Sequence, residues 1–380
     1  MKSNGLPTGI TLRKDGRYMW RFKYAGVEYS GYSQKLGDCK KALTAKRYEV
    51  EHGIYSKEQQ ITFDAWFTEW MGTYRGNTVK DSTANLYWNT YNRYIKPEFG
   101  KKQLKSLKPE QIQKFTNRMA GKYSETVAGQ ANYLLYDCLQ QAANLRIIAV
   151  NPMQNTVVPK FRESEKKRAV SAEQEKIFLK ATESSKYYPV YRMASLSGMR
   201  IGEILGLQWD CVSFDNETIT VRRTMTYISH RGLFLDTPKS KSSNRTIPMA
   251  KGGKLWTLLH EQAVKQKKQR MKAGELWEPL EGMDNLVFTT ETGKPFYSVN
   301  IASAIRVTVK RLKESGTDLG NFTFHTLRHC FATRCIEGGM NPKTLQSILG
   351  HATFAMTMDL YGDVMENTRQ EEMRAMNEAL

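Results

Sequence analysis

The 380-residue sequence has no run of about 18 or more apolar residues, the length that a membrane-spanning helix needs. Its first residues, MKSNGLPTGITLRKDGR, lack the apolar core of a signal peptide. The five cysteines are odd in number and scattered, without a Cys-x-x-Cys pair, which argues against a disulfide framework and a zinc cluster. We therefore expect a soluble cytoplasmic protein with reduced cysteines and no membrane partner.

Acidic residues are scarce relative to basic ones. The chain has 57 Lys and Arg against 38 Asp and Glu, a net charge of +19. Such an excess implies a polyanionic partner, most simply nucleic acid, although basic chains also bind membranes non-specifically. Residues 1–60 carry 12 basic and 6 acidic residues, 61–168 carry 17 and 9, and the remaining 212 residues carry 28 and 23. We expect much of the electrostatic attraction for phosphate in the first 168 residues.

Residues 9–32 are typical of three short strands joined by tight turns, and a helix is expected over about 38–52. In YMWRFKY, residues 18–24, the aromatic side chains alternate with Arg21 and Lys23. The pattern predicts a half-buried sheet with a partly basic outer face, on which Arg21 and Lys23 are candidate DNA contacts. The alternative is a generic adaptor whose lysines are only solvated.

Four helices are expected next, over about 62–73, 82–95, 109–119 and 124–145. Thr62 is placed to cap the first, and Pro97 follows the second. Apolar and aromatic residues repeat at helical spacing, which favours a packed core over a platform for base stacking. Residues 151–168 form a linker whose cations are either solvated or laid along DNA. They are Lys160, Arg162, Lys166, Lys167 and Arg168.

The C-terminal part of the chain contains several histidine, arginine and tyrosine residues at spacings that suggest a common site. His325 and Arg328 are three residues apart in a helical stretch, so they share one face and can point at one small target such as a phosphate. A Leu-Gly-His triplet ends at His351, and Tyr361 follows ten residues later. His329 lies one turn from His325, but a zinc-hydrolase helix would have Glu directly after the first His, where Thr326 stands. No metal or cofactor is expected.

An earlier stretch, GMRIGEILGLQW, fits an arginine held at the start of a helix. Gly198 and Gly202 permit close backbone approach around Arg200, and Glu203 is placed to hold its surroundings. Strands are predicted over TITVRRTMTYI, GLFLDT and NRTIPM, with PKSKSSN as the hairpin tip between the last two. That tip contains Lys239 and Lys241.

These motifs together resemble the tyrosine recombinases, the family of phage and conjugative-transposon integrases, Xer recombinases and their relatives. The family signature is His-x-x-Arg, then Leu-Gly-His or Trp, then the nucleophilic Tyr about ten residues on. A lysine on a β-hairpin is also catalytic in the family, and Lys239 is preferred here over Lys241. The resemblance implies the catalytic residues Arg200, Lys239, His325, Arg328 and His351, with Tyr361 as nucleophile.

The resemblance also implies a multidomain fold, mainly α with small β-sheets. Residues 1–57 would form a β-β-β-α arm-binding domain, 62–155 an all-α, SAM-like core-binding domain, and 168–362 an α+β catalytic domain. Residues 363–380 would form a tail that packs on a neighbouring protomer. Lys241 joins the candidate DNA contacts.

By the family's chemistry we expect a site-specific integrase that integrates and excises a mobile element without metal or ATP. It would act through a 3′-phosphotyrosine and a Holliday junction, as a homo-tetramer on double-stranded DNA with core and arm sites, helped by an excisionase and DNA-bending proteins. Three alternatives remain: DNA relaxation like that of a type IB topoisomerase, resolution by a Xer-type enzyme, and DNA binding without catalysis. An arm-like N-terminal module argues against the first two, and a filled set of catalytic positions argues against the third.

Overall fold

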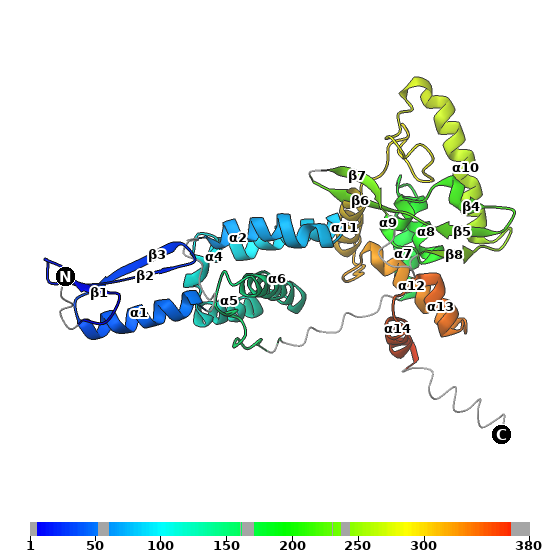
Figure 1. The fold of residues 1–380 in the computed structure, drawn as a ribbon. Helices are drawn as coiled ribbons and strands as arrows, with labels where there is room; N and C mark the ends of the chain where they lie inside the picture. The colour runs from blue at the N-terminus through cyan, green and yellow to red at the C-terminus, as the bar shows by residue number, and fades with distance from the viewer. Residues whose placement is uncertain are drawn as a thin grey trace. The chain divides into compact units, whose positions relative to one another are not determined.

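The computed structural model describes residues 6–51, 61–159, 161, 171–229, 231–236 and 244–365. The chain divides into two compact units, Met1–Ser164 and Glu165–Leu380. The predicted fold class, multidomain and mainly α with small antiparallel sheets, is confirmed (Figure 1). No helix in the described ranges is long and apolar enough to cross a membrane.

The first unit begins with a three-stranded antiparallel sheet and one helix, as predicted. Strands β1 (Ile10–Leu12), β2 (Tyr18–Tyr24) and β3 (Val27–Ser33) pair in chain order, and α1 (Leu36–Glu51) follows. Alternation places Trp20 and Phe22 in a small core, whereas Arg21 and Lys23 are exposed on the other face. Arg21 pairs loosely with Glu28 at 3.7 Å. The basic outer face is therefore confirmed.

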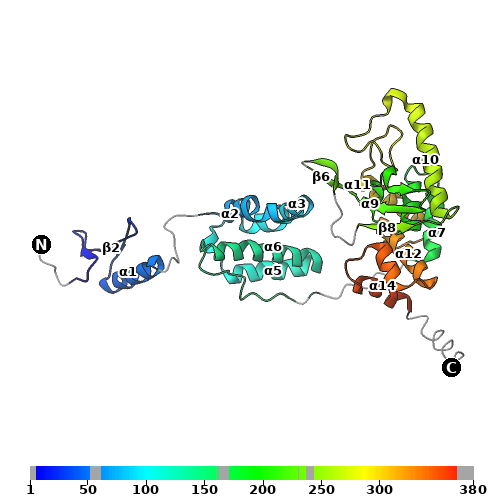
Figure 2. The ribbon, with the colours of Figure 1, turned by 45° about the vertical axis from the view of Figure 1, so that its right-hand side comes forward.

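The remainder of the first unit is helical and has its own aromatic core. Helix α2 (Phe63–Glu69) is capped by Thr62 Oγ1, which accepts a hydrogen bond from the backbone N–H of Ala65 at 3.2 Å. Helices α3 (Asp81–Thr90), α5 (Pro109–Lys122) and α6 (Glu125–Asn144) complete this helical part (Figure 2). Trp66, Phe67 and Tyr91 lie in its core. The aromatic stripes are core, as the spacing indicates.

Two π-helical segments distinguish this unit from the regular helices expected. Trp70–Arg75 extends α2, and Tyr91–Ile95 extends α3 before α4 (Lys96–Phe99) begins. Pro97 was expected beyond the second helix but lies in the first turn of α4. A proline lacks a backbone N–H, so the wider π turn before it lets the chain continue in helical form with one fewer donor.

The second unit contains two small sheets, a large hydrophobic core and a smaller cluster near its C-terminal helices. Helices α7 (Ala172–Ala181), α8 (Tyr188–Ser197) and α9 (Ile201–Leu205) precede the strands. A three-stranded sheet has the order β4 (Val212–Ser213), β5 (Thr218–Val221) and β8 (Arg245–Pro248). A two-stranded sheet pairs β6 (Thr224–Ile228) with β7 (Gly232–Asp236).

The strand prediction needs two corrections here. The stretch TITVRRTMTYI is not one strand, because β5 and β6 belong to different sheets and residues 222–223 separate them. The strand NRTIPM pairs with β5, whereas GLFLDT pairs with β6, so PKSKSSN does not join two paired strands within the described part of the chain. Pairing between distant strands depends on the packing of the core, which local alternation does not encode.

Helices complete the second unit around these sheets. Helix α10 (Lys254–Ala273) is long and basic toward its end, and α11 (Ser298–Glu314) lies further along the chain. Helices α12 (Phe324–Glu337), α13 (Pro342–Leu349) and α14 (Ala355–Met365) hold the C-terminal motif and lie close together (Figure 1). Residues 366–380, most of the expected tail, lie outside the described residues.

Candidate active site

Arg200 stands at the N-terminus of the short helix α9, as its surroundings predict. The Ser197 hydroxyl donates to the Met193 carbonyl at 2.6 Å and closes α8, and Gly198 then takes the left-handed conformation with φ 64°. The backbone N–H of Arg200 donates to Glu203 Oε2 at 2.9 Å, and its guanidinium donates to Glu203 Oε1 at 2.9 Å. The carboxylate therefore fixes both the backbone and the side chain of Arg200.

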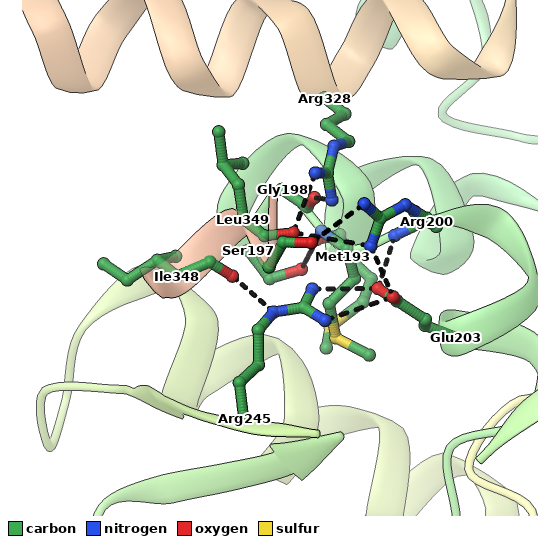
Figure 3. Close-up of polar contacts among 11 residues, drawn as sticks. Met193, Ser197, Gly198, Arg200, Glu203, Arg245, Arg328, Ile348 and Leu349 are labelled. Carbon is green, nitrogen blue, oxygen red and sulfur yellow. Dashed lines mark hydrogen bonds and ion pairs between the residues drawn. The ribbon is translucent and has the colours of Figure 1, made fainter. Parts of the chain in front are cut away.

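Arg328 lies on α12, and its side chain reaches toward Gly198 and Leu349, close to Arg200 (Figure 3). Its guanidinium donates to the Gly198 carbonyl at 2.7 Å and to the Leu349 carbonyl at 2.8 Å. The Arg200 guanidinium donates to the neighbouring Gly350 carbonyl at 3.1 Å. Two arginines far apart in the sequence are thus held against one turn of backbone, with N–H groups left for a further acceptor because each guanidinium has five.

Arg245, a residue that the motifs did not single out, is a third guanidinium in this cluster. It is 7% exposed and donates to Glu203 Oε1 at 3.1 Å and Oε2 at 2.8 Å, and its Nε donates to the Ile348 carbonyl (Figure 3). Gly350, with φ 65°, leaves room for it, since an added Cβ would come 3.0 Å from Arg245 Cδ. Arg245 therefore joins the Glu203 carboxylate to the turn that precedes His351.

The neighbours of Glu203 favour the ionised form of its carboxyl. Burial by itself would raise the pKa of the Glu203 carboxyl, but hydrogen bonds and charge from Arg245 and then Arg200 outweigh it and hold the pKa below its usual value. Burial, then the charge of Arg200, lowers the pKa of Arg328 to about 9, so this guanidinium stays cationic at neutral pH. The site is a dense positive cluster organised by one carboxylate.

Both predicted histidines lie within the field of this cluster. Burial is the largest cause that lowers the pKa of His325 to about 4, followed by His329, Arg328 and Arg200. Burial, then Arg328 and Arg200, lowers the pKa of His351 to about 4 as well. Each imidazole is therefore neutral at pH 7 and can donate through only one ring nitrogen.

The ring of His351 has a defined partner. Its Nδ1 lies 2.9 Å from the Oγ1 of Thr357, a side chain with no exposed surface. The His351 backbone N–H donates to the Gln346 carbonyl at 3.3 Å. Backbone and Nδ1 are both held, so the ring orientation is fixed.

Tyr361 lies on α14, four residues after Thr357, and is 5% exposed. Its hydroxyl donates to the Met340 carbonyl, and its ring packs with Ala332, Ile336 and Leu345. Burial, and to a smaller extent Cys335, raises the pKa of Tyr361. The phenol is therefore neutral at pH 7. Before it can act as a nucleophile, a base must take its proton or the positive charge of the arginine cluster must favour its loss.

Comparison with known proteins bears on this arrangement directly. Residues 159–367 match the model of the phage integrase family, and residues 62–120 match the phage integrase N-terminal SAM-like domain. The chain belongs to the phage integrase family. It is thus a tyrosine recombinase, an enzyme that transfers DNA strands.

Relatives of this integrase family member include a protein named tyrosine recombinase XerC-like from Caldanaerobacter subterraneus, 26% identical over 90% of each chain. The transposase from transposon Tn916 of Enterococcus faecalis is 25% identical over 98% of this chain and 95% of that one. The integrase of transposon Tn1549, solved in complex with a circular intermediate DNA, has a TM-score of 0.68 and 24% identity, covering 83% of this chain and 99% of that one. A lambda integrase tetramer bound to a Holliday junction has a TM-score of 0.55 and 18% identity over 94% and 96%.

Of the residues predicted for catalysis in this recombinase, the described structure gathers Arg200, His325, Arg328 and His351. Tyr361 lies on the adjoining helix. Lys239 and the candidate contacts Lys160, Arg162, Lys166, Lys167, Arg168 and Lys241 lie outside the described residues. No group of three or more His, Cys, Asp and Glu in the described ranges is arranged to hold a metal ion.

Glu203→Gln is expected to lower the free energy of unfolding of the second unit by about 3 kcal/mol, because Arg200 and Arg245 would lose the carboxylate that both of them contact. The folded pKa of Glu203 is below its unfolded value, so this contribution is present above the unfolded pKa and disappears as the pH falls through the folded pKa. Hydrogen exchange of α12 and β8 peptides through a urea titration at pH 7 and pH 3 measures the loss. Glu173→Gln, an exposed residue paired with Lys176, is the control, and equal losses in both variants would contradict the assignment.

Proposed function

We propose that this chain is a site-specific DNA integrase that integrates and excises a mobile element through a 3′-phosphotyrosine and a Holliday junction. The observation that carries the proposal is the convergence of Arg200 and Arg328 on the Leu349–Gly350 backbone, with His325 and His351 beside them. A phosphodiester is anionic and gains charge on its non-bridging oxygens during attack. Two guanidiniums are suited to bind those oxygens because each presents paired N–H groups and stays charged.

In this proposal the Tyr361 oxygen attacks the phosphorus of the scissile phosphodiester and the bond to the 5′ oxygen breaks. The phenolic proton leaves to a base, and the departing 5′ oxygen takes a proton from Lys239. His325 and His351 donate hydrogen bonds or move protons at the phosphate. The covalent link keeps the bond energy, so a 5′-hydroxyl of the partner duplex can attack it and rejoin the strands without ATP.

We assign separate DNA contacts to the parts of the chain. Residues 1–57 would bind arm sites, 62–155 would cover the core site, and 168–362 would cleave it. Homo-tetramer assembly on two core sites, with residues 363–380 packed on a neighbouring protomer, and help from excisionase and DNA-bending proteins complete the proposal. Support comes from relatives of similar length whose names are recombinase and transposase.

Type IB topoisomerase activity is the main competing function, because it uses similar cleavage chemistry on a single duplex. The deciding experiment is strand exchange between two labelled duplexes that carry a site selected from random-sequence DNA by the full chain. A recombinase yields joint molecules and exchanged products. Relaxation of supercoiled DNA without any exchanged product would refute the integrase assignment.

The N-terminal sheet offers a separate prediction. The double variant Arg21→Gln/Lys23→Gln is expected to reduce the slope of log binding constant against log salt concentration by about 1.8, since each lost phosphate contact removes about 0.9. Fluorescence anisotropy of the full chain on a long selected duplex across a salt series measures this slope. Gln substitution of Lys310 and Lys313, exposed on α11, is the matched control. An unchanged slope in the Arg21/Lys23 variant would remove this face from the DNA contacts.

A further inference from the structure

The family motif does not state which side chain donates the hydrogen bond between His351 and Thr357. Nδ1 and Oγ1 are 2.9 Å apart, His351 is 8% exposed and Thr357 is not exposed at all. A threonine hydroxyl can donate or accept, so this single contact is compatible with either tautomer of the ring. Which tautomer is present decides what the opposite nitrogen, Nε2, can do.

The surroundings of His351 restrict the choice. Burial and the arginine cluster keep the ring neutral at pH 7, so it carries one N–H hydrogen. The oxygens of a phosphodiester only accept hydrogen bonds. A neutral His351 can therefore assist a phosphate held by Arg200 and Arg328 only when its hydrogen is on Nε2, which leaves Nδ1 as an acceptor.

We propose that Thr357 is a positioning residue whose hydroxyl donates to Nδ1 of His351 and so holds the imidazole in the Nε2–H tautomer that can donate to the scissile phosphate. A backbone carbonyl at this place, the common partner of a histidine Nδ1, would accept from Nδ1 and fix the opposite tautomer. A hydroxyl is the small uncharged group that can donate there. The inference rests on the proposed role of His351 in DNA cleavage.

Thr357 lies on the same helix as Tyr361, the proposed nucleophile. Thr357 and Tyr361 are four residues apart on α14 and so share one face of that helix. The element that delivers the tyrosine thus also orients His351. Docking of α14 sets both groups at once, and an undocked α14 would leave the tautomer of His351 without its donor.

Nitrogen-15 spectra of the full chain labelled at its six histidines test the tautomer without any DNA. The His351→Gln spectrum identifies the signals of His351. We expect the Nε2–H pattern in the wild type and in Thr357→Ser, and a downfield shift of the Nδ1 signal in Thr357→Val, where the hydrogen bond is lost. An Nδ1–H pattern in the wild type would overturn the proposal whatever the cleavage activity, so this result is independent of the proposed function.

Cleavage of a nicked selected duplex provides the second readout. Thr357→Val, which keeps the shape of the side chain, is expected to slow covalent complex formation roughly tenfold through loss of one hydrogen bond, with Thr357→Ser restoring the rate. Thr353→Val, an exposed threonine between His351 and the start of α14, is the matched control. Wild-type rates in Thr357→Val would overturn the positioning role, and thermal melting of the variants excludes loss of fold as the cause of a slow rate.

Discussion

Arg328→Lys is expected to slow DNA cleavage about 10²-fold to 10³-fold, the usual effect of removing one preorganised donor from a transition state. The Arg328 guanidinium donates to two carbonyls, those of Gly198 and Leu349. A guanidinium has five N–H groups, so others remain to donate to a phosphate oxygen. A lysine ammonium is a compact point charge and cannot bridge both carbonyls while it clamps the phosphate. Single-turnover formation of the covalent complex on a nicked duplex measures the change.

Arg334→Lys is the matched control for this substitution. Arg334 lies on the same helix α12, is partly buried, and pairs with Glu175 and the Ser195 carbonyl instead of the cluster around Leu349. Its replacement is expected to reduce stability while leaving the cleavage rate of the folded protein unchanged. Equal loss of rate in the two variants would mean that Arg328 acts only through the packing of α12.

Tyr361→Phe is expected to abolish covalent DNA attachment and strand exchange while leaving DNA affinity within about twofold, because DNA affinity comes mainly from phosphate contacts that this change does not touch. The variant removes the only atom that can attack phosphorus from this side chain. It also leaves the Met340 carbonyl without the hydroxyl that donates to it, a modest loss for a single neutral hydrogen bond. Denaturing gel electrophoresis of labelled DNA measures the adduct.

Tyr297→Phe provides the comparison for Tyr361→Phe. Tyr297 is an exposed tyrosine of the same unit, 42% exposed, at the start of α11. The comparison variant is expected to cleave at the wild-type rate. Persistence of a covalent adduct in Tyr361→Phe would assign the nucleophile to another side chain.

The residues that the structure gathers could be singled out in the sequence by short, local spacings together with the resemblance to the family signature. His325 and Arg328 share a helix face by periodicity alone, and Arg200 is placed by the glycines around it. The neutrality of the two histidines could not be read from any spacing. It follows from burial first, and then from nearby positive groups: His329, Arg328 and Arg200 at His325, and Arg328, Arg200 and Arg245 at His351.

Arg245 is a residue of the cluster that the sequence motifs did not indicate. The strand NRTIPM alternates, and Arg245 shares its buried face with Ile247, a place where a cation needs a carboxylate partner. Glu203 stands in a mainly apolar stretch and is a suitable partner. An arginine and a glutamate that both point into the core therefore indicate an ion pair. The pairing of β8 with β5 instead of β7 had no such signal, because it is decided by the core that both strands help to form.

The four helices predicted in the first unit are present, but the short helix α4 and the two π segments were not predicted. Thr62 and the proline at position 109 act as the local rules state. The π segment Tyr91–Ile95 places Tyr91 in full contact with Phe67, with ring centroids 3.7 Å apart. The aromatic packing and the proline that follows together favour the wider turn, and only the first of these depends on distant residues.

Identification of the atom that carries the DNA tests most directly whether Tyr361 is the nucleophile. The wild-type chain is incubated with a nicked selected duplex, the covalent complex is digested with protease and nuclease, and the linked peptide is sequenced by mass spectrometry. We expect a peptide containing Tyr361 joined to a 3′-phosphate, with a free 5′-hydroxyl on the other strand end. An adduct at another residue, a 5′-phosphate linkage, or tight DNA binding with no adduct at all would contradict this expectation.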